Sequence, residues 1–560
     1  MKSTSALASL CALLPVPLFG FGAEDASRPV PLTESRATER PTREDPATDG
    51  AVKAGKDDVL LPVLRGLTIA ATAEEALELQ KENEDGVKLA GFPEADREVI
   101  RKIAEPAIGK RVSLRSLDRL TSELETAFRS SGRSFVKVSF PEQEITSGVV
   151  AVIVCPARTG RIVLAGKPSF GLKFAADAFR TLPGGELSGD VVVEDLEWIN
   201  QNPLRRASIS YSDGAAPDAL DLSLRIRADK VWRAYAGIDN QLSEDLGDQR
   251  LFAGFQYGDL FSLDHRITAQ YTSSADSKSL RGVSGIYEVP LPVRHLLDFS
   301  LGYTESDSDT AGPIDQSGKF SRAAFVYRIP LPRWRAVSQE WRMGMEFRNN
   351  DYLFSDGSSS DVRFFQLETG WKGRRPDRWG TTKADASLLY SPGQGVLGSD
   401  DEDFIALGGE GADSVIVRGE VERTLKFGEV ATLLGRCEAQ WSDSVLLSSD
   451  QISAGGYGRV RGFDETVGYA SKGMVATIEL QSKFYQSPKT GEFQAVSFID
   501  GALLHRDQDS DVGQIASTGI GLRWRYEDHF STRIDLGVPI DYPDDESGDP
   551  MVHFSVSTTW

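Results

Sequence analysis

The sequence predicts a chain in two parts, an α+β region followed by an all-β, antiparallel transmembrane barrel. Between residues 58 and 230, the order strand, helix, helix, strand, strand occurs twice. From residue 231 to 560 the helical period is absent, and segments of about ten residues alternate in hydrophobicity between turn residues, as in membrane-spanning barrels. A soluble β-sandwich or a repeat protein is the alternative for this second part, since alternation within one segment is a weak signal.

The N-terminus has the features of an exported protein. Residues 1–23 combine Lys2, an apolar run and small residues at the end, which predicts a secretory signal peptide. A lipid anchor at Cys11 is disfavoured because Leu10 stands where a small residue is needed. Residues 24–57 hold four prolines among many charges and predict a flexible leader.

Composition limits the possible functions. The formal net charge of −21 over 560 residues argues against nucleic acid as a partner. After cleavage only Cys155 and Cys437 remain, far apart in the sequence, so we expect packing residues and no disulfide. No later stretch approaches the roughly 20 apolar residues of a membrane helix, so the chain is either soluble or crosses a membrane as strands.

Residues 58–157 predict a first β-α-α-β-β module. An apolar run, Val59 to Ile69, predicts the first strand. Helical spacing follows around Val99 to Ala104 and again from Leu114 to Phe128, where leucines recur three or four apart and Gly132 ends the helix. Two strands, Ser134 to Phe140 and Val149 to Cys155, complete the module.

Residues 158–230 predict a second module with the same element order, which makes the pair an internal repeat. The expected strands are Arg161 to Ala165, Ala207 to Tyr211 and Leu220 to Ile226, and the expected helices are Phe174 to Leu182 and Val191 to Asn200.

Residues 231–560 predict a barrel of sixteen strands, an even number as a closed antiparallel barrel requires. Connections after even segments are mostly short, whereas those after odd segments are mostly long and acidic, which fixes the orientation of the barrel in the membrane. Aromatic residues near segment ends fit interfacial girdles. The expected segments begin near residues 231, 249, 264, 280, 295, 319, 338, 361, 381, 414, 429, 471, 493, 515, 529 and 550.

The long loop from Asp443 to Ala470 differs from the other external loops because it is rich in glycine and poor in acids. Glycine permits tight turns, so this loop can fold into the lumen. Its arginines, Arg459 and Arg461, then need carboxylate partners, because an unpaired buried guanidinium costs several kcal/mol.

Here the sequence resembles a known family. Val460-Arg461-Gly462-Phe463 resembles the V-R-G-[FY] signature of outer-membrane polypeptide transporters and insertases, and it lies in the sixth external loop, as the signature does there. Two modules before sixteen strands resemble the POTRA pair of the two-partner secretion transporters, the TpsB or haemolysin secretion and activation family (ShlB/FhaC/HecB). Further matching stretches are Phe140-Pro141-Glu142-Gln143 with Gly148, Leu196 to Arg205, and Gly237 to Asn240. The final Trp560 resembles the C-terminal signal by which the barrel assembly machinery recognises its substrates.

The resemblance implies a loop-barrel lock. In the family, the loop arginine pairs with an aspartate of an F-x-D-x-G motif on the inner wall, matched here by Phe498, Asp500 and Gly501 on the thirteenth strand. Glycine stands one position early, and Ala502 replaces the expected one. Phe498 and Asp500, two apart, share one face of the strand, which must face the lumen if Asp500 meets Arg461. The plainer alternative makes Arg461 an external charged residue.

The resemblance also implies a function: translocation of a secreted partner exoprotein across the lipid of the outer membrane, with the POTRA domains in the periplasm and without ATP. Unfolded cargo would add a strand to a POTRA sheet edge; alternatively, the POTRA domains only brace the barrel. An assembly insertase and a passive porin are the rival functions. Family members often plug the pore with an N-terminal helix, but this proline-rich leader disfavours a long one. Ala73 to Asp85 could form a short helix, but their place inside the first module argues against a plug. Five scattered histidines and no nucleophile or phosphate-loop motif predict no enzyme, no metal and no cofactor.

Overall fold

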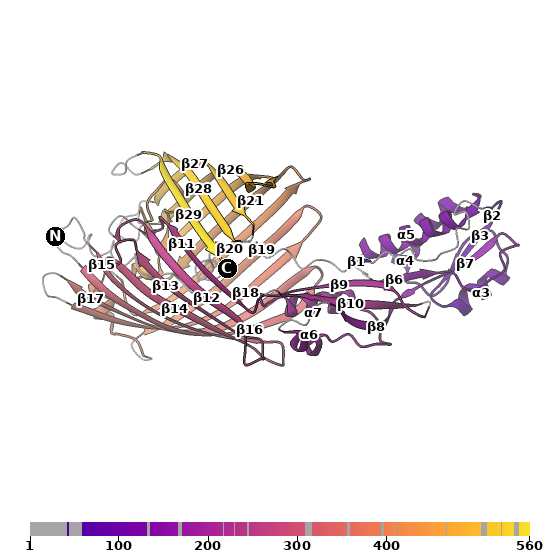
Figure 1. Ribbon diagram of the computed structural model, residues 1–560, viewed down its shortest axis with the longest axis horizontal. Coiled ribbons are helices and arrows are strands. Elements are labelled where there is room, and N and C mark those ends of the chain that lie inside the picture. The colour runs from indigo at the N-terminus through magenta and orange to yellow at the C-terminus, as the bar shows by residue number, and fades with distance from the viewer. Residues whose placement is uncertain are drawn as a thin grey trace. The chain divides into compact units, whose positions relative to one another are not determined.

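The computed structural model describes residues 42–43 and 59–560, with gaps at 131–134, 166–170, 217, 229, 243–245, 309–315, 355–358, 394–396, 408, 466, 506–511, 528 and 543–547. The expected signal peptide, nearly all of the leader and Gly132 lie outside the described residues. The chain divides into two compact units, one within Arg36–Asp229 and one that contains Lys230–Trp560 (Figure 1).

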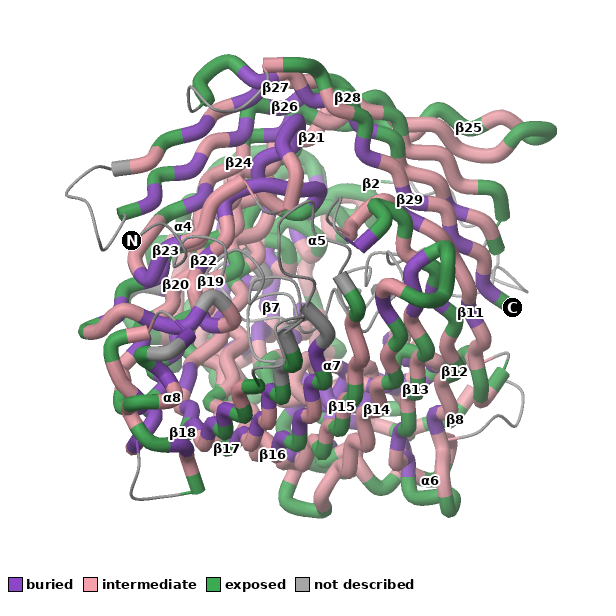
Figure 2. The backbone as a smooth tube through the Cα atoms, turned by 90° about the vertical axis from the view of Figure 1, so that its left-hand side faces the viewer, coloured by how far each residue is buried: buried purple, intermediate pink, exposed green. Residues whose placement is uncertain are grey.

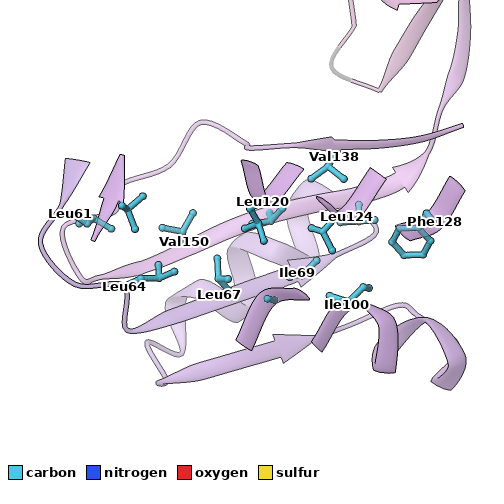
Figure 3. Packing of buried hydrophobic residues seen from close by; sticks show 14 residues of the cluster. Leu61, Leu64, Leu67, Ile69, Ile100, Leu120, Leu124, Phe128, Val138 and Val150 are labelled. Carbon is cyan, nitrogen blue, oxygen red and sulfur yellow. The ribbon is translucent and has the colours of Figure 1, made fainter. Parts of the chain in front are cut away.

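The first module is a four-stranded sheet covered by helices, with strand order β4-β3-β7-β6. Leu67, Ile69 and Val150 from the strands are buried against Leu124 and Phe128 from a helix (Figure 3). The elements are β2 (Val59–Leu61), β3 (Gly66–Ala70), α3 (Ala73–Lys81), β4 (Gly86–Leu89), α4 (Glu94–Ala104), β5 (Val112–Ser113), α5 (Leu114–Ser130), β6 (Val136–Ser139) and β7 (Val149–Pro156).

Two features of the first module correct the sequence prediction. The apolar run Val59 to Ile69 is two strands, since Pro62 and the residues after it separate β2 from β3, and β2 pairs with β5. The helix α3 and strand β4 are additional to the β-α-α-β-β order, and β3 pairs in parallel with both β4 and β7. Helix α3 begins at the cap Thr72, whose hydroxyl accepts the Glu75 N–H.

The second module has a sheet of order β1-β9-β10-β8, in which β10 is parallel to β8 and antiparallel to β9. Asn200, at the end of helix α7, joins this helix to strand β9. The Asn200 side chain donates to the Ala207 carbonyl (3.0 Å) and accepts from the Ala207 N–H (2.6 Å). The elements are β1 (Thr42–Arg43), β8 (Arg158–Ala165), α6 (Leu172–Ala178), α7 (Gly189–Ile199), β9 (Arg206–Asp213) and β10 (Ala219–Arg227).

The second unit is a closed antiparallel barrel. Because β24 and the short β25 both pair with β26, they form one wall strand, and the described strands make sixteen, as predicted. The barrel closes where β11 pairs with β29. The wall consists of β11 (Trp232–Asp239), β12 (Arg250–Leu260), β13 (His265–Ser274), β14 (Leu280–Pro290), β15 (Leu296–Ser308), β16 (Gln316–Trp334), β17 (Val337–Phe354), β18 (Ser359–Pro376), β19 (Gly380–Pro392), β20 (Asp413–Phe427), β21 (Ala431–Ser442), β24 (Lys472–Ser482), β25 (Tyr485–Ser487), β26 (Gly491–His505), β27 (Val512–Tyr526), β28 (Phe530–Asp541) and β29 (Met551–Thr559).

Burial alternates from residue to residue along the barrel strands, as the changes of colour along the tube in Figure 2 show. On β26, for example, Ile499 and Leu503 are exposed apolar residues, while Asp500 and Ala502 are buried. The apolar face is the one that meets lipid, so the buried polar face lines the lumen. No helix among the described residues has the length and apolar character that a membrane crossing needs.

The long connections include structure that the sequence pattern did not predict. The loop between β19 and β20 contains α8 (Asp401–Ala406), and the loop between β21 and β24 contains the small strands β22 (Ile452–Ser453) and β23 (Tyr469–Ala470). These two loops pack together, since Phe404 and Leu407 of the first contact Leu447 of the second.

Cys155 and Cys437 are free, and burial raises the pKa of the Cys155 thiol.

Candidate functional site

The loop between β21 and β24, residues 443–471, folds against the inner face of the barrel wall; we refer to it as loop six. Val460 and Phe463 are buried and pack with Val475, Ala502 and Ile515, side chains of β24, β26 and β27. The two apolar residues of the Val460 to Phe463 motif thus anchor the loop to the wall by hydrophobic packing.

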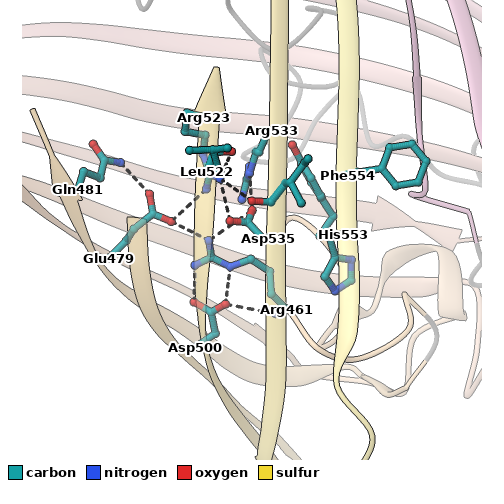
Figure 4. Close-up of polar contacts among 12 residues, drawn as sticks. Arg461, Glu479, Gln481, Asp500, Leu522, Arg523, Arg533, Asp535, His553 and Phe554 are labelled. Carbon is teal, nitrogen blue, oxygen red and sulfur yellow. Dashed lines mark hydrogen bonds and ion pairs between the residues drawn. The ribbon is translucent and has the colours of Figure 1, made fainter. Parts of the chain in front are cut away.

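Arg461 is the charged centre of the contact (Figure 4). Its Nε and Nη2 donate to the two carboxylate oxygens of Asp500 at 2.7 and 2.9 Å, and its backbone N–H donates to the same group at 3.2 Å. Its Nη1 donates to Glu479 at 2.7 Å. The guanidinium also lies over the Phe498 ring, 3.4 Å from the centroid. Only 3% of the Arg461 side chain is exposed and none of the Asp500 side chain, so this charge-assisted fork lies away from bulk water.

Two further arginines and one further carboxylate complete a cluster of three arginines and three carboxylates. Asp535 on β28 accepts from Arg523 at 2.8 Å and from Arg533 at 2.7 Å, and it lies 3.8 Å from Arg461. Gln481 donates to Glu479 at 2.7 Å. Within the described residues, the formal charges of the cluster therefore cancel, which buried ions require.

Glycines in the wall make room for the loop. Phe498 lies next to Gly519, and Gly519 lies next to Gly537, in one row of neighbouring strands. A β-carbon at Gly519 would lie 2.3 Å from the Phe498 ring, and one at Gly537 would lie 2.4 Å from the Gly462 nitrogen. Gly462 itself has φ of +98°, a left-handed conformation that favours glycine. The loop backbone therefore rests directly on the wall backbone.

His553 on β29 is a further contact of the motif. Its Nε2 accepts the Gly462 N–H at 2.9 Å, which only an unprotonated ring nitrogen can do. Its ring also lies edge-on to Tyr457 in the loop, and the Arg533 guanidinium stacks 4.0 Å over the Tyr457 ring.

Loop six has a second anchor at its root. Both carboxylate oxygens of Asp450 accept from Arg348 of β17, at 2.8 and 2.9 Å. The Asp450 carbonyl accepts from Arg418 of β20 and from Gln440 of β21. Asp450 and Arg348 are both buried, so the loop is tied to the wall at two places, near Asp450 and near Arg461.

The structure brings together most of the residues that the sequence singled out. Val460, Arg461, Gly462, Phe463, Phe498 and Asp500 meet at one place on the wall. Gly501 does not join them, because it lies between Asp500 and Ala502 and therefore faces the other side of β26. Ala502, which replaces the expected glycine, packs with Val460 and Phe463. Arg459 pairs with Glu438 at 3.2 Å.

Sequence reasoning missed Glu479, Arg523, Arg533, Asp535, His553 and the Asp450 anchor. Strand alternation places Glu479 and Asp535 on the lumen face, but which residues meet depends on the register between strands. Among the described residues, no group of histidine, cysteine, aspartate and glutamate side chains has the arrangement to hold a metal ion.

Comparison with known proteins places this barrel and its loop in a family. The sequence model of the family described as haemolysin secretion/activation protein ShlB/FhaC/HecB matches residues 219–524. The chain belongs to this family. A second model, the ShlB-type POTRA domain, matches residues 84–157. The protein is therefore an outer-membrane transporter with its POTRA domains in the periplasm, as the sequence predicted.

Several relatives of the transporter are known. It is 21% identical over 454 residues to the outer membrane transporter CdiB of Dickeya dadantii, covering 77% of this chain and 78% of the relative. It is 28% identical over 215 residues to the heme/hemopexin transporter protein HuxB of Haemophilus influenzae, covering 35% of this chain and 36% of that protein. The solved structure of CdiB from Escherichia coli shares its fold, with a TM-score of 0.64, 19% identity and coverage of 92% of this chain and 94% of that one.

Proposed function

We propose that this transporter moves a secreted partner exoprotein, of the haemolysin or adhesin kind, through its barrel as an unfolded chain and without ATP. The observation that carries the proposal is the placement of loop six, whose Arg461 is buried against Asp500 and Glu479 inside a closed sixteen-stranded barrel. A loop fastened to the lumen wall by polar contacts can be released without unfolding the wall.

The lock formed by Val460, Arg461, Gly462, Phe463, Phe498 and Asp500 acts as a two-state element. Its ionic part is strong only while water is excluded, because a charge-assisted bond weakens in high dielectric. An arriving cargo segment that wets or displaces the loop would therefore weaken the lock cooperatively. Gly501, which faces the other side of the strand, has no part in this mechanism.

For the POTRA domains, we expect cargo to pair with an open sheet edge. In the second module, β8 is an edge strand, and the residues 184–187 cover only its beginning through bonds to Ala157 and Thr159. Across the described residues, no backbone partner lies on the outer side of Arg161 to Ala165, and Val163 and Leu164 are 51% and 44% exposed. An extended apolar segment fits this edge through main-chain bonds.

The insertase remains the alternative function. The structure of BamA from Haemophilus ducreyi lacking POTRA domains 1–3 shares the fold, with a TM-score of 0.50, 13% identity and coverage of 84% of this chain and 98% of that one. A shared fold does not by itself establish a shared function. The family match and the pair of modules both favour secretion.

The test is transport in a purified system. The full-length transporter, reconstituted in liposomes, receives a urea-unfolded exoprotein encoded next to its gene, without nucleotide. We expect the exoprotein to become protease-protected inside the vesicles, and equally so with added ATP. No protection with its true partner, or protection only with ATP, would contradict the proposal. Increased folding of an added outer-membrane barrel would support the insertase instead.

A further inference from the structure

Two neighbouring short turns of the barrel differ from the rest in carrying arginine beside tryptophan. Trp334 ends β16 and Arg335 follows it in the turn to β17, and Arg378 and Trp379 lie in the connection of β18 to β19. The two turns are neighbours because β17 and β18 pair along their length, with Ser338 opposite Arg374 at this rim. The short turns face the periplasm, so these residues lie at the periplasmic edge of the barrel.

The register places the patch on the side of the wall that meets lipid. Trp341 of β17 lies opposite Trp371 of β18, and Trp341 belongs to the exposed apolar face with Met343 and Met345. Arg375 is an even number of positions from Trp371 and so shares this face. Trp334 pairs with Val337, which shares the face of Trp341. Trp334 and Trp379 are 63% and 58% exposed.

Within the part of the chain that the structure describes, no carboxylate pairs with the cations of this patch. Among the described residues, Arg335, Arg375 and Arg378 make no ion pair. The acid of the second turn, Asp377, is used by Arg423 at 2.8 Å and by the N–H groups of Trp379 and Gly380. The lumen arginines Arg342, Arg348 and Arg461, by contrast, all pair with carboxylates. In a chain with net charge −21, three unpaired guanidiniums on one rim are a local excess of positive charge.

Each turn also stacks its cation on its tryptophan. The Arg335 guanidinium lies 5.2 Å from the Trp334 ring centroid, and that of Arg378 lies 4.8 Å from the Trp379 centroid. This stacking orders the guanidinium at the level of the ring. Exposed tryptophan favours the depth of the lipid headgroups. Three other short turns expose Phe261, Val293 or Val430 where these two expose tryptophan.

From this arrangement we infer that Arg335, Arg375 and Arg378, with Trp334 and Trp379, bind the phosphate of anionic phospholipid headgroups in the periplasmic leaflet. The guanidinium forks donate to phosphate oxygens, which they match in geometry and charge. The rings anchor the site at the depth where those phosphates lie. The site would fix the height of the periplasmic rim in the membrane.

The test compares lipids bound by the full-length protein. Native mass spectrometry counts phosphatidylglycerol and phosphatidylethanolamine retained from mixed micelles of a neutral detergent with equal amounts of the two lipids. We expect the wild type to retain phosphatidylglycerol preferentially. The variant R335Q/R375Q/R378Q should lose that preference, with its binding of phosphatidylglycerol falling on the order of tenfold. The variant R335K/R375K/R378K should keep part of it.

The matched control removes three cations near the opposite rim, in K278Q/K319Q/R363Q, and should retain the wild-type preference. Heat-modifiable gel mobility establishes that each barrel is folded. If the triple glutamine variant does not fold, R335Q/R378Q, which changes only turn residues, is measured in its place. The inference is wrong if the wild type shows no preference, if the glutamine variant keeps it, or if the control loses as much. The lipid site is also rejected if an acidic peptide binds the patch of the wild type and phosphatidylglycerol vesicles do not displace it. That result would assign the patch to a protein partner.

Discussion

The backbone of Gly462 in loop six rests directly on the backbone of Gly537 in β28. A β-carbon at Gly537 would lie 2.4 Å from the Gly462 nitrogen and 2.6 Å from the Arg461 carbonyl carbon. These are main-chain atoms on both sides, so no side-chain rotation relieves the overlap. The ion pairs of Arg461 therefore depend on two glycines that carry no charge.

This contact predicts that Gly537→Ala weakens the lock without altering any ionic group. The added methyl displaces the loop by several tenths of an ångström or more, which lengthens the bonds from Arg461. We expect lower secretion and a larger single-channel conductance in planar bilayers. The control is Gly435→Ala on β21, where an added β-carbon meets nothing within 4 Å. Equal conductance of the two variants would contradict the packing argument.

The root anchor predicts a separable effect of Asp450→Asn. The substitution keeps the Asp450 carbonyl, which accepts from Arg418 and Gln440, but it removes the carboxylate that binds Arg348. Leaving a buried guanidinium with a weakened partner costs about 1–3 kcal/mol. We expect faster proteolysis within loop six and a lower temperature of barrel melting on gels. The control is Asp400→Asn, at an exposed position of the loop between β19 and β20, which should behave as the wild type does. Equal losses in both variants would show that the effect is not specific to the Asp450 anchor.

His553 predicts a difference between two substitutions of similar size. His553→Leu removes the acceptor of the Gly462 N–H, whereas the amide oxygen of His553→Gln can accept that bond. We expect the leucine variant to raise conductance and the glutamine variant to stay nearer the wild type. Indistinguishable variants would show that the bond to Gly462 contributes nothing to the position of the loop.

The open edge of β8 predicts a cargo-binding variant in the second module. Val163→Lys places a charge on the edge, which opposes strand addition, and the exposed position tolerates it. We expect weaker binding of the unfolded exoprotein to the full-length transporter in surface plasmon resonance. Leu182→Lys, 71% exposed in the same module but outside any strand, serves as control. If both variants bind as the wild type does, cargo uses another surface.

Most of the fold could be predicted from the sequence because the barrel depends on alternation, which is local. Ile499 and Leu503 against Asp500 on β26 illustrate this pattern. The pairing of β2 with β5 and the addition of β4 could not be predicted, since both depend on pairing with other strands, although Pro62 does mark the break between β2 and β3. Likewise, Arg461 and Asp500 were found through their motifs, but Asp535 and His553 meet the loop only through the register of β28 and β29. A motif names residues, whereas register determines their neighbours.

The most direct test of the lock is secretion of the partner exoprotein by cells that carry Arg461→Ala. This change leaves Asp500 and Glu479 without the cation that joins loop six to the wall. Culture supernatant is assayed for exoprotein, and folded barrel in the outer membrane is measured by heat-modifiable gel mobility. We expect a fall in secretion while the folded barrel remains abundant. Unchanged secretion, with the barrel at wild-type level, would contradict a role of the lock in transport.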